Sequence, residues 1–131
     1  MARHFVYNSL IIFGIGAVSY GLVEVVSRGY THPSMLLAGG ICFLSMWWID
    51  SNRRINFVVK CILSAIIVTS VELLFGYIFN IILKLNVWDY SAEPYNFLGQ
   101  ICLKFFFIWC FLSAGGLLLS RFIWRALKLN R

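Results

Sequence analysis

The chain has 131 residues, of which 61% are hydrophobic and 12% charged, with a formal net charge of +6. Its mean hydropathy is +0.85. A soluble domain is about 45–50% apolar and about 25% charged, and a chain this short cannot hide such an apolar excess in one water-soluble core. The composition therefore excludes a soluble enzyme, a disordered regulator and a disulfide-stapled secreted domain. It places the chain in a lipid bilayer.

Four apolar stretches are long enough to cross a membrane as helices, which takes about 17–25 residues each. We predict an all-α polytopic membrane protein, built as a single domain (1–131) with a four-helix transmembrane bundle. The first stretch is too long for the apolar region of a signal peptide and three more follow it, so we interpret it as a retained helix. The predicted helices cover residues 5–26, 33–49, 55–83 and 97–120, and a basic interfacial tail follows at 121–131.

Lysine and arginine gather at one end of these predicted helices. Eight of the eleven lie there: Arg3, Arg53, Arg54, Lys60, Arg121, Arg125, Lys128 and Arg131. Arg28 and Lys84 mark the other end, and Lys104 falls within the fourth span. Because basic residues favour the cytoplasmic side, we predict a cell-membrane protein with both termini in the cytoplasm and the loops at 27–33 and 84–96 outside. Contact with lipid headgroups explains the basic excess better than nucleic-acid binding does.

The four cysteines give no indication of a metal centre or a disulfide framework. All lie within apolar stretches, and none forms a Cys-x-x-Cys pair or a metal-ligand spacing with His4 or His32. A free cysteine packs as a small hydrophobic residue. We therefore expect no metal, no cofactor and no catalytic residue among them.

Small and polar residues share one face on three of the predicted helices, where close packing between membrane helices requires them. The stripe in the first span consists of Gly14, Ala17, Gly21, Glu24 and Arg28. The stripe in the third span consists of Ala65, Thr69, Glu72, Gly76 and Asn80. In the fourth span Asn96, Gln100 and Lys104 follow one another at four-residue steps, and the second span contributes Gly39 and Gly40. We expect all these faces to look into the bundle.

Glu24, Glu72 and Lys104 are the charged candidates within the spans. An ionised side chain at the bilayer centre costs at least about 2.5–3.5 kcal/mol on insertion scales, so such residues mark a site, a pathway or a structural pair. The rise of about 1.5 Å per residue places all three toward the outer surface. We predict that they converge in one pocket and that Lys104 neutralises Glu72, Glu24 or both. A purely structural salt bridge and a site for a solute or ion both remain open.

The outer loop at 87–96 is predicted to be an ordered cover and not a flexible linker. Its aromatic residues suit a membrane surface, Asp89 and Ser91 can bond to the local backbone, and Pro94 fixes a turn. Together with the opposite loop at 28–33 it is expected to close over the charges, as a structural cover or as a lid. The candidate ligand-binding or pathway residues are Glu24, Arg28, His32, Glu72, Trp88, Asp89, Tyr90, Asn96, Gln100 and Lys104.

These same residues carry a resemblance to a known family. The matching positions are Gly21 and Glu24, Thr31-His32, Gly39-Gly40, Glu72 to Gly76, Val87 to Ser91, Pro94, Asn96 and Gly99 to Cys102. Over nearly its whole length the chain resembles the CmpB-like family of small multi-pass membrane proteins, named as permeases of ABC transporters. The resemblance implies that Glu24, Glu72 and the 88–91 block are signature positions. Longer members carry a Cys-Pro-Ile-Tyr-Gly stretch where this chain has His32-Pro33-Ser34, so no role of that stretch is transferred.

Three functions are compatible with these features. The first is a small-solute permease or solute-binding membrane component with an outward-facing polar site; because the chain has no Gly-x-x-x-x-Gly-Lys-Ser/Thr phosphate loop, ATP-driven transport needs a separate ATPase subunit. The second is a structural or accessory protein that forms a homo-oligomer or binds a partner. The third is an intramembrane enzyme acting on a lipid headgroup, which the sequence favours least because no nucleophile–base pair is visible.

Overall fold

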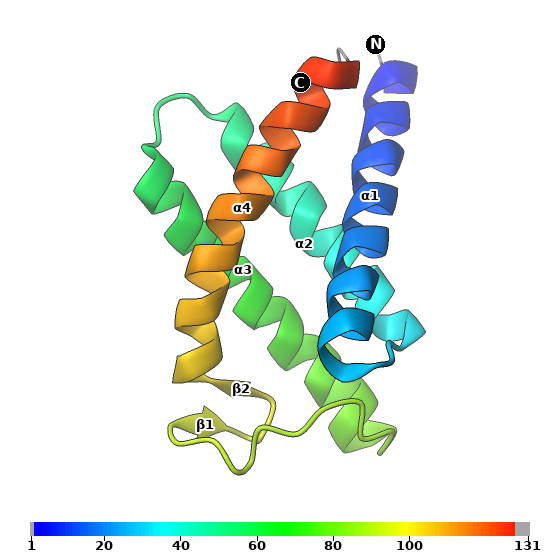
Figure 1. Ribbon diagram of the computed structural model, residues 1–131, viewed down its shortest axis with the longest axis vertical. Coiled ribbons are helices and arrows are strands. Elements are labelled where there is room, and N and C mark those ends of the chain that lie inside the picture. The colour runs from blue at the N-terminus through cyan, green and yellow to red at the C-terminus, as the bar shows by residue number, and fades with distance from the viewer. Residues whose placement is uncertain (1, 128–131) are drawn as a thin grey trace.

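The computed structural model describes residues 2–127, which form a bundle of four long helices (Figure 1). The helices are α1 (Ala2–Arg28), α2 (Pro33–Ser51), α3 (Phe57–Phe75) and α4 (Leu103–Leu127). A π-helix, η1 (Gly76–Ile82), continues α3 without a break. All four are long and apolar enough to cross a membrane, with α3 and η1 forming one span. The predicted all-α fold with four membrane-spanning helices is confirmed.

Neighbouring helices in sequence are also neighbours in space. α1 packs on α2 and α3 packs on α4, while α2 also contacts α3 and α4. α1 and α4 lie on the near side of the bundle in Figure 1 and make little direct contact with each other. α1 begins and α4 ends at the same end of the bundle, beside the turn between α2 and α3. The opposite end holds the α1–α2 loop and the segment 83–102, which we call the cap.

Side-chain caps explain where two of the helices begin. His32 precedes α2 in an extended conformation, and its Nδ1 accepts a hydrogen bond of 3.2 Å from the Ser34 backbone N–H. Pro33 then occupies the first helical position. A backbone N–H at this position has no partner within the helix, so a proline there costs no hydrogen bond. Asn56 begins α3 in the same way, since its Oδ1 accepts from the Val59 N–H at 2.9 Å. Predicted and observed starts of these two helices therefore agree within two residues.

The prediction that the fourth helix begins at residue 97 is wrong. Two short strands, β1 (Asn96–Phe97) and β2 (Ile101–Cys102), pair antiparallel just before α4. The chain turns between them with positive φ angles at Leu98 (56°) and Gly99 (69°), a conformation that cannot continue a right-handed helix. Asn96 and Gln100 therefore belong to a hairpin and do not share a helical face with Lys104.

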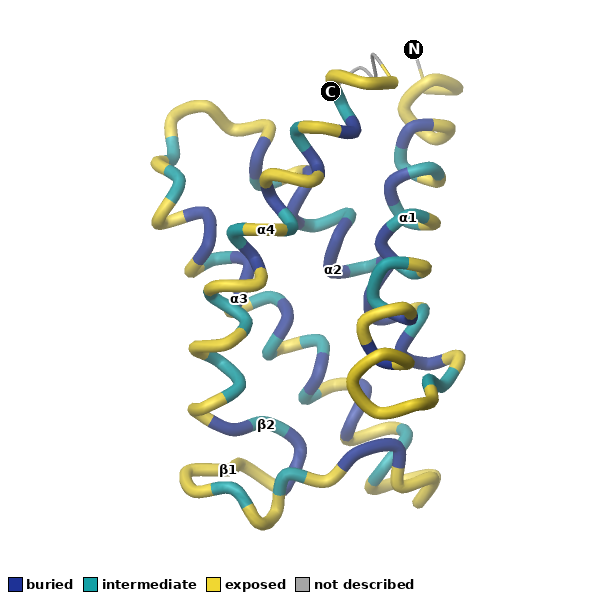
Figure 2. The backbone as a smooth tube through the Cα atoms, in the orientation of Figure 1, coloured by how far each residue is buried: buried dark blue, intermediate teal, exposed yellow. Residues whose placement is uncertain are grey.

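At its other end α4 runs further than predicted. Residues 121–127, the first part of the predicted basic tail, continue the helix to Leu127. The last part of the predicted tail, residues 128–131, lies outside the described residues. Exposed residues recur along α1 and α4 (Figure 2). Many of them are apolar, for example Val18 at 63% and Phe111 at 82% exposure. Such surfaces suit contact with lipid, which is as apolar as they are.

The close contact between α1 and α2 uses a different glycine from the one predicted. A Cβ atom on Gly16 would lie 3.0 Å from the Gly39 carbonyl oxygen and 2.4 Å from Cβ of Phe43. Gly14, the first residue of the predicted stripe, is exposed, and a Cβ there would meet no atom within 4 Å. Gly21 and Glu24 of the stripe are buried and Ala17 is half-buried, whereas Arg28 at its other end is exposed, so the inward face is correct only in its middle.

A buried ion cluster joins three helices at the end where α1 begins. Asp50 of α2 is 3% exposed and binds the Lys60 ammonium of α3 at 3.0 Å. The Arg121 guanidinium of α4 donates to the same carboxylate, with Nη2 2.8 Å from Oδ1. The sequence places Lys60 and Arg121 only among the basic residues of one end and does not predict this cluster. The ion pairs of both with Asp50 tie α2, α3 and α4 together.

We expect Gly16→Leu to destabilise the bundle by about 1–3 kcal/mol, because the new side chain has no space between α1 and α2. Thermal unfolding of the detergent-solubilised protein measures the effect. Gly14→Leu is the matched control and should leave the unfolding temperature nearly unchanged or raise it. Equal losses in both variants would contradict the packing described here.

Replacing Asp50 with asparagine should lower the free energy of unfolding by about 3–5 kcal/mol, because it leaves the buried Lys60 ammonium without its counter-ion. Denaturant titration in a mild detergent is the measurement. Glu93→Gln serves as the comparison, since its pair with Lys104 is 3.8 Å long and half exposed, and such pairs contribute less than about 1 kcal/mol. A similar small loss for both variants would show that the cluster is not a structural tie.

Candidate functional site

A pocket of about 270 Å³ opens at the cap end of the bundle, between α1, α4 and the cap; most of its lining is apolar, and we call it the polar pocket because Glu24 and Arg28 lie at its edge. Its charged and aromatic lining comes from residues far apart in the sequence, among them Tyr20, Glu24, Arg28, Trp88, Tyr90 and Trp109. Four of the candidate residues predicted from the sequence thus line one cavity: Glu24, Arg28, Trp88 and Tyr90.

Glu24 and Arg28 form the charged edge of the pocket on α1. They lie one helical turn apart, and the Arg28 Nε donates to Glu24 Oε2 at 2.8 Å. A second guanidinium nitrogen of Arg28 pairs with the same oxygen. Arg28 also donates to the Val87 carbonyl at 3.4 Å, which links α1 to the cap. The negative charge of Glu24 is therefore balanced within its own helix.

Glu72 of α3 lies behind the wall of the pocket and is 6% exposed. Its Oε2 accepts a hydrogen bond from the Trp109 indole N–H at 3.0 Å, and its Oε1 accepts from the Tyr90 hydroxyl at 3.3 Å. No lysine or arginine among residues 2–127 forms an ion pair with it. The carboxyl group therefore orients two side chains that line the pocket, one from α4 and one from the cap.

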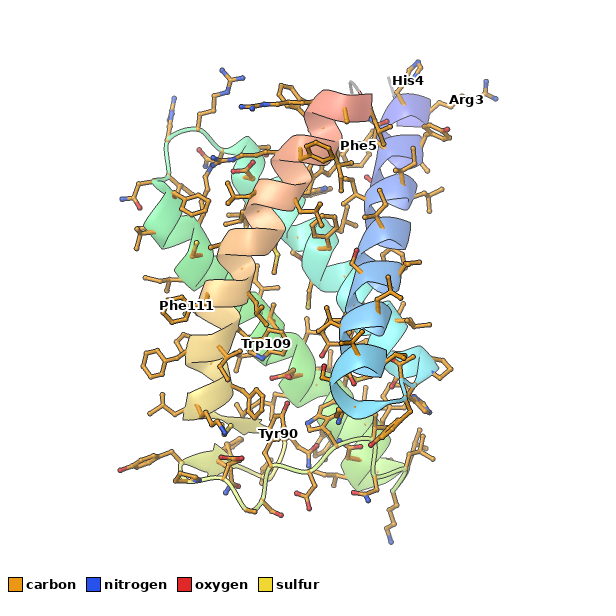
Figure 3. All side chains as sticks on the ribbon, in the orientation of Figure 1. Arg3, His4, Phe5, Tyr90, Trp109 and Phe111 are labelled. Carbon is orange, nitrogen blue, oxygen red and sulfur yellow. The ribbon has the colours of Figure 1, made fainter. Side chains whose placement is uncertain are left out.

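Aromatic rings build most of the remaining wall. Tyr90 stacks on Phe105 with centroids 4.6 Å apart and an angle of 8° between the rings. Tyr20 of α1 stacks on Trp109 of α4 at 6.1 Å and 28°. In Figure 3 Trp109 points from α4 toward the interior, whereas Phe111 points to the outside. Burial, with the Glu72 carboxylate beside it, raises the pKa of the Tyr90 phenol well above its ordinary value, so this hydroxyl remains a donor.

Gln100 and Trp88 hold the cap on η1 and do not contribute charge. The Gln100 side-chain oxygen accepts from Asn80 Nδ2 at 2.7 Å, and its backbone carbonyl accepts from the Trp88 indole N–H at 3.0 Å. Asn80 Oδ1 in turn accepts from the Val87 N–H at 2.7 Å. Gly76 lies against this network, since a Cβ there would come within 2.5 Å of Gln100 Oε1. The cap is thus a docked, hydrogen-bonded structure.

Two other candidates, Asp89 and Asn96, shape the cap hairpin and do not line the pocket. Asp89 Oδ1 accepts from the Ser91 N–H at 2.9 Å, and hydrogen bonds from Ser91 lower the pKa of this exposed carboxyl. Asn96 Nδ2 donates to the Glu93 carbonyl at 2.8 Å, and its Oδ1 accepts from the Gly99 N–H at 3.1 Å. Both side chains satisfy the backbone of tight turns.

The predicted pairing of Lys104 with Glu72 or Glu24 is wrong. The Lys104 side chain is 59% exposed, and its ammonium pairs with Glu93 Oε1 at 3.8 Å. The reason is the late start of α4, which places Lys104 in the first turn of the helix and beside the hairpin. His32 is also outside the pocket lining: it caps α2, and its ring meets Phe79 edge-on at 6.1 Å.

Sequence reasoning missed Tyr20, Phe105 and Trp109, which line the pocket. Tyr20 precedes Glu24 and Arg28 at helical steps of four, so the stripe in the first span contained a signal for it. No comparable pattern distinguishes Trp109 from the other aromatic residues of its span. Its role becomes visible only through its bond to Glu72 across two helices.

Comparison with known proteins places this architecture in a family. A family described as "Putative ABC-transporter type IV", the CmpB group, matches residues 1–129. The chain belongs to this CmpB family. Neither a curated protein nor a solved structure matches it. The family name indicates a membrane protein of ABC-transporter type, and the match over residues 1–129 confirms the resemblance of nearly the whole chain to the CmpB family.

Proposed function

We propose that this protein is a solute-binding membrane component of a transporter, and that the polar pocket takes the positively charged part of the solute. The observation that carries the proposal is the buried carboxyl group of Glu72 behind the pocket wall. Glu24 is paired with Arg28, whereas Glu72 has hydrogen-bond donors but no lysine or arginine ion pair among residues 2–127. An uncompensated buried charge is unfavourable, and a bound cation relieves it.

The pocket wall suits an organic ammonium group better than a metal ion. Tyr20, Phe105, Tyr90 and Trp109 bring aromatic rings to the cavity, and a cation over the face of such a ring is attracted by the ring quadrupole. When the cation is desolvated, each such contact contributes about 2 kcal/mol or more. Metal binding instead needs converging oxygen, nitrogen or sulfur ligands, and no group of three such acidic, His or Cys side chains forms in the described part of the chain.

Each candidate residue then has a definite role in the proposal. Glu72 supplies the attracting charge and orients Tyr90 and Trp109, while Glu24 and Arg28 fix the α1 edge and the cap. Trp88 and Gln100 hold the cap in place. Asp89, Asn96 and His32 position the surrounding loops, and Lys104 lies outside the pocket.

Transport by such a chain requires partners. ABC-type transport uses ATP, and the sequence contains no phosphate-binding loop, so we propose a separate ATPase subunit. We also propose that the chain forms homo-oligomers, since four helices surrounding a 270 Å³ pocket leave little room for a private pore. The buried Asp50 cluster lies at the end where such a subunit would bind if the termini are cytoplasmic.

The orientation follows from the distribution of lysine and arginine, which favours a cytoplasmic location for both termini and an outward-facing pocket in the cell membrane. A cysteine introduced at Ser91, in the exposed cap, should react with a membrane-impermeant maleimide on intact cells. A cysteine at Ser51, exposed beside the α2–α3 turn, should react only after permeabilisation. The wild-type protein gives the background from its four native cysteines, and reversed accessibility would invert the proposed orientation.

Choline is the probe for the pocket, with 3,3-dimethylbutan-1-ol as its uncharged counterpart. Purified protein in nanodiscs should bind choline, and the alcohol should bind at least tenfold more weakly because it has no charge. Glu72→Gln keeps an oxygen acceptor for Trp109 and Tyr90 but removes the charge, so choline affinity should fall about tenfold or more.

Glu93→Gln is the matched control for this experiment, because it removes an acidic charge from the cap outside the pocket. Its choline affinity should equal that of the wild type. Equal binding of choline and the alcohol, or full affinity in Glu72→Gln, would overturn the proposed site.

A further inference from the structure

A second, apolar cavity adjoins the polar pocket. It has a volume of about 190 Å³ and lies between α1 and α4, with α2 as its floor; we call it the α1–α4 groove. Gly39, Cys42, Phe43 and Met46 of α2 contribute to the floor, and Val68 of α3 lies beside them. On the α4 side it extends from Trp109 to Leu119, ten residues or about 15 Å along the helix.

The groove and the polar pocket meet at a shared boundary. Tyr20, Val23, Trp109 and Leu112 line both cavities. The stacked pair of Tyr20 and Trp109 stands at this junction, and Trp109 is also the side chain bound to Glu72. A molecule that spans the junction is therefore surrounded by charged and aromatic side chains at one end and by apolar side chains along the rest of its length.

The groove also opens sideways out of the bundle. α1 and α4 make little direct contact, and the residues flanking the opening are exposed, with Val23 at 55% and Leu112 at 51%. In a bilayer this side of the bundle faces hydrocarbon, so an alkyl chain reaches the groove without passing through water. Gly116 helps to keep the groove open, since a Cβ there would press on Met46 Sδ at 2.8 Å.

We propose that the solute is an amphiphile of the membrane, whose ammonium head occupies the polar pocket and whose alkyl chain lies in the α1–α4 groove. This inference rests on the proposed function, because it uses the same charge of Glu72 for the head. The acidic side chains of the pocket favour a cationic head, and the shared boundary of the two cavities favours an alkyl chain attached to it. The lateral opening gives the entry route, so the protein binds a lipid-like cation taken from the bilayer.

The n-alkyltrimethylammonium ions test the proposal, since they share one head and differ only in chain length. Equilibrium dialysis against protein in nanodiscs, with empty nanodiscs as background, measures affinity for the ethyl, hexyl and decyl compounds. The affinity of the wild-type protein should rise with chain length, by at most about fourfold for each methylene that leaves water for the groove. Glu72→Gln should lower the affinity for all three compounds by the same factor.

Two pairs of variants separate the groove from general partitioning into lipid. Leu119→Trp fills the far end of the groove, whereas Leu118→Trp places the same ring on the exposed outer side of α4. Gly116→Leu likewise fills the groove, whereas Gly115→Leu adds the same side chain where a Cβ meets no atom within 4 Å. The groove variants should bind the decyl compound about tenfold or more less tightly and the ethyl compound unchanged. Both controls should behave as the wild type.

The outcomes distinguish this inference from the proposed function. If the ethyl compound binds through Glu72 but chain length adds nothing, or adds equally in groove and control variants, the amphiphile is refuted and the solute site stands. If no compound binds above the empty nanodiscs, or Glu72→Gln binds all of them fully, both proposals are refuted. Ethyl binding in the groove variants shows that they are folded.

Discussion

A bilayer offers no water to a buried polar group, so a buried carboxyl group there depends on the protein for its partners. Two carboxylates at opposite ends of the bundle show how differently this is done. Asp50 is bound by the cations Lys60 and Arg121 and joins three helices. Glu72 accepts hydrogen bonds from the neutral donors Trp109 and Tyr90 and has no lysine or arginine ion pair within residues 2–127. The first carboxyl group joins helices through ion pairs, and the second positions two aromatic side chains through hydrogen bonds.

The features that depend on local sequence could be predicted. Hydropathy and span length predicted four helices, and Gly21 and Glu24 of the first-span stripe identified the inward face of α1. The third-span stripe is inward too, with Ala65, Glu72 and Gly76 buried. These predictions succeeded because the helical period and the composition of lipid-facing surfaces are properties of short segments. The approach of Glu24 and Glu72 to one cavity follows from their similar depths.

The features that depend on contacts between distant segments could not be predicted. The four-residue spacing of Asn96, Gln100 and Lys104 predicts a helix, but residues 96–102 form a hairpin. The positive φ of Leu98 in its turn is not predictable from a residue pattern. That one turn moves Asn96 and Gln100 off the helix and directs Lys104 to Glu93. The choice of Gly16 over Gly14, and the bond from Arg121 to Asp50 across 71 positions, depend on how helices cross. Periodicity carries no information on either.

The sparse contact between α1 and α4 has a mechanical consequence. The bundle consists of two helical hairpins, α1–α2 and α3–α4, that touch mainly through α2, and cavities occupy the remaining seam. A ligand that binds in this seam contacts both the first and the last helix, so its binding free energy stabilises the assembled bundle. Occupancy of the seam and the association of the two hairpins are therefore thermodynamically linked.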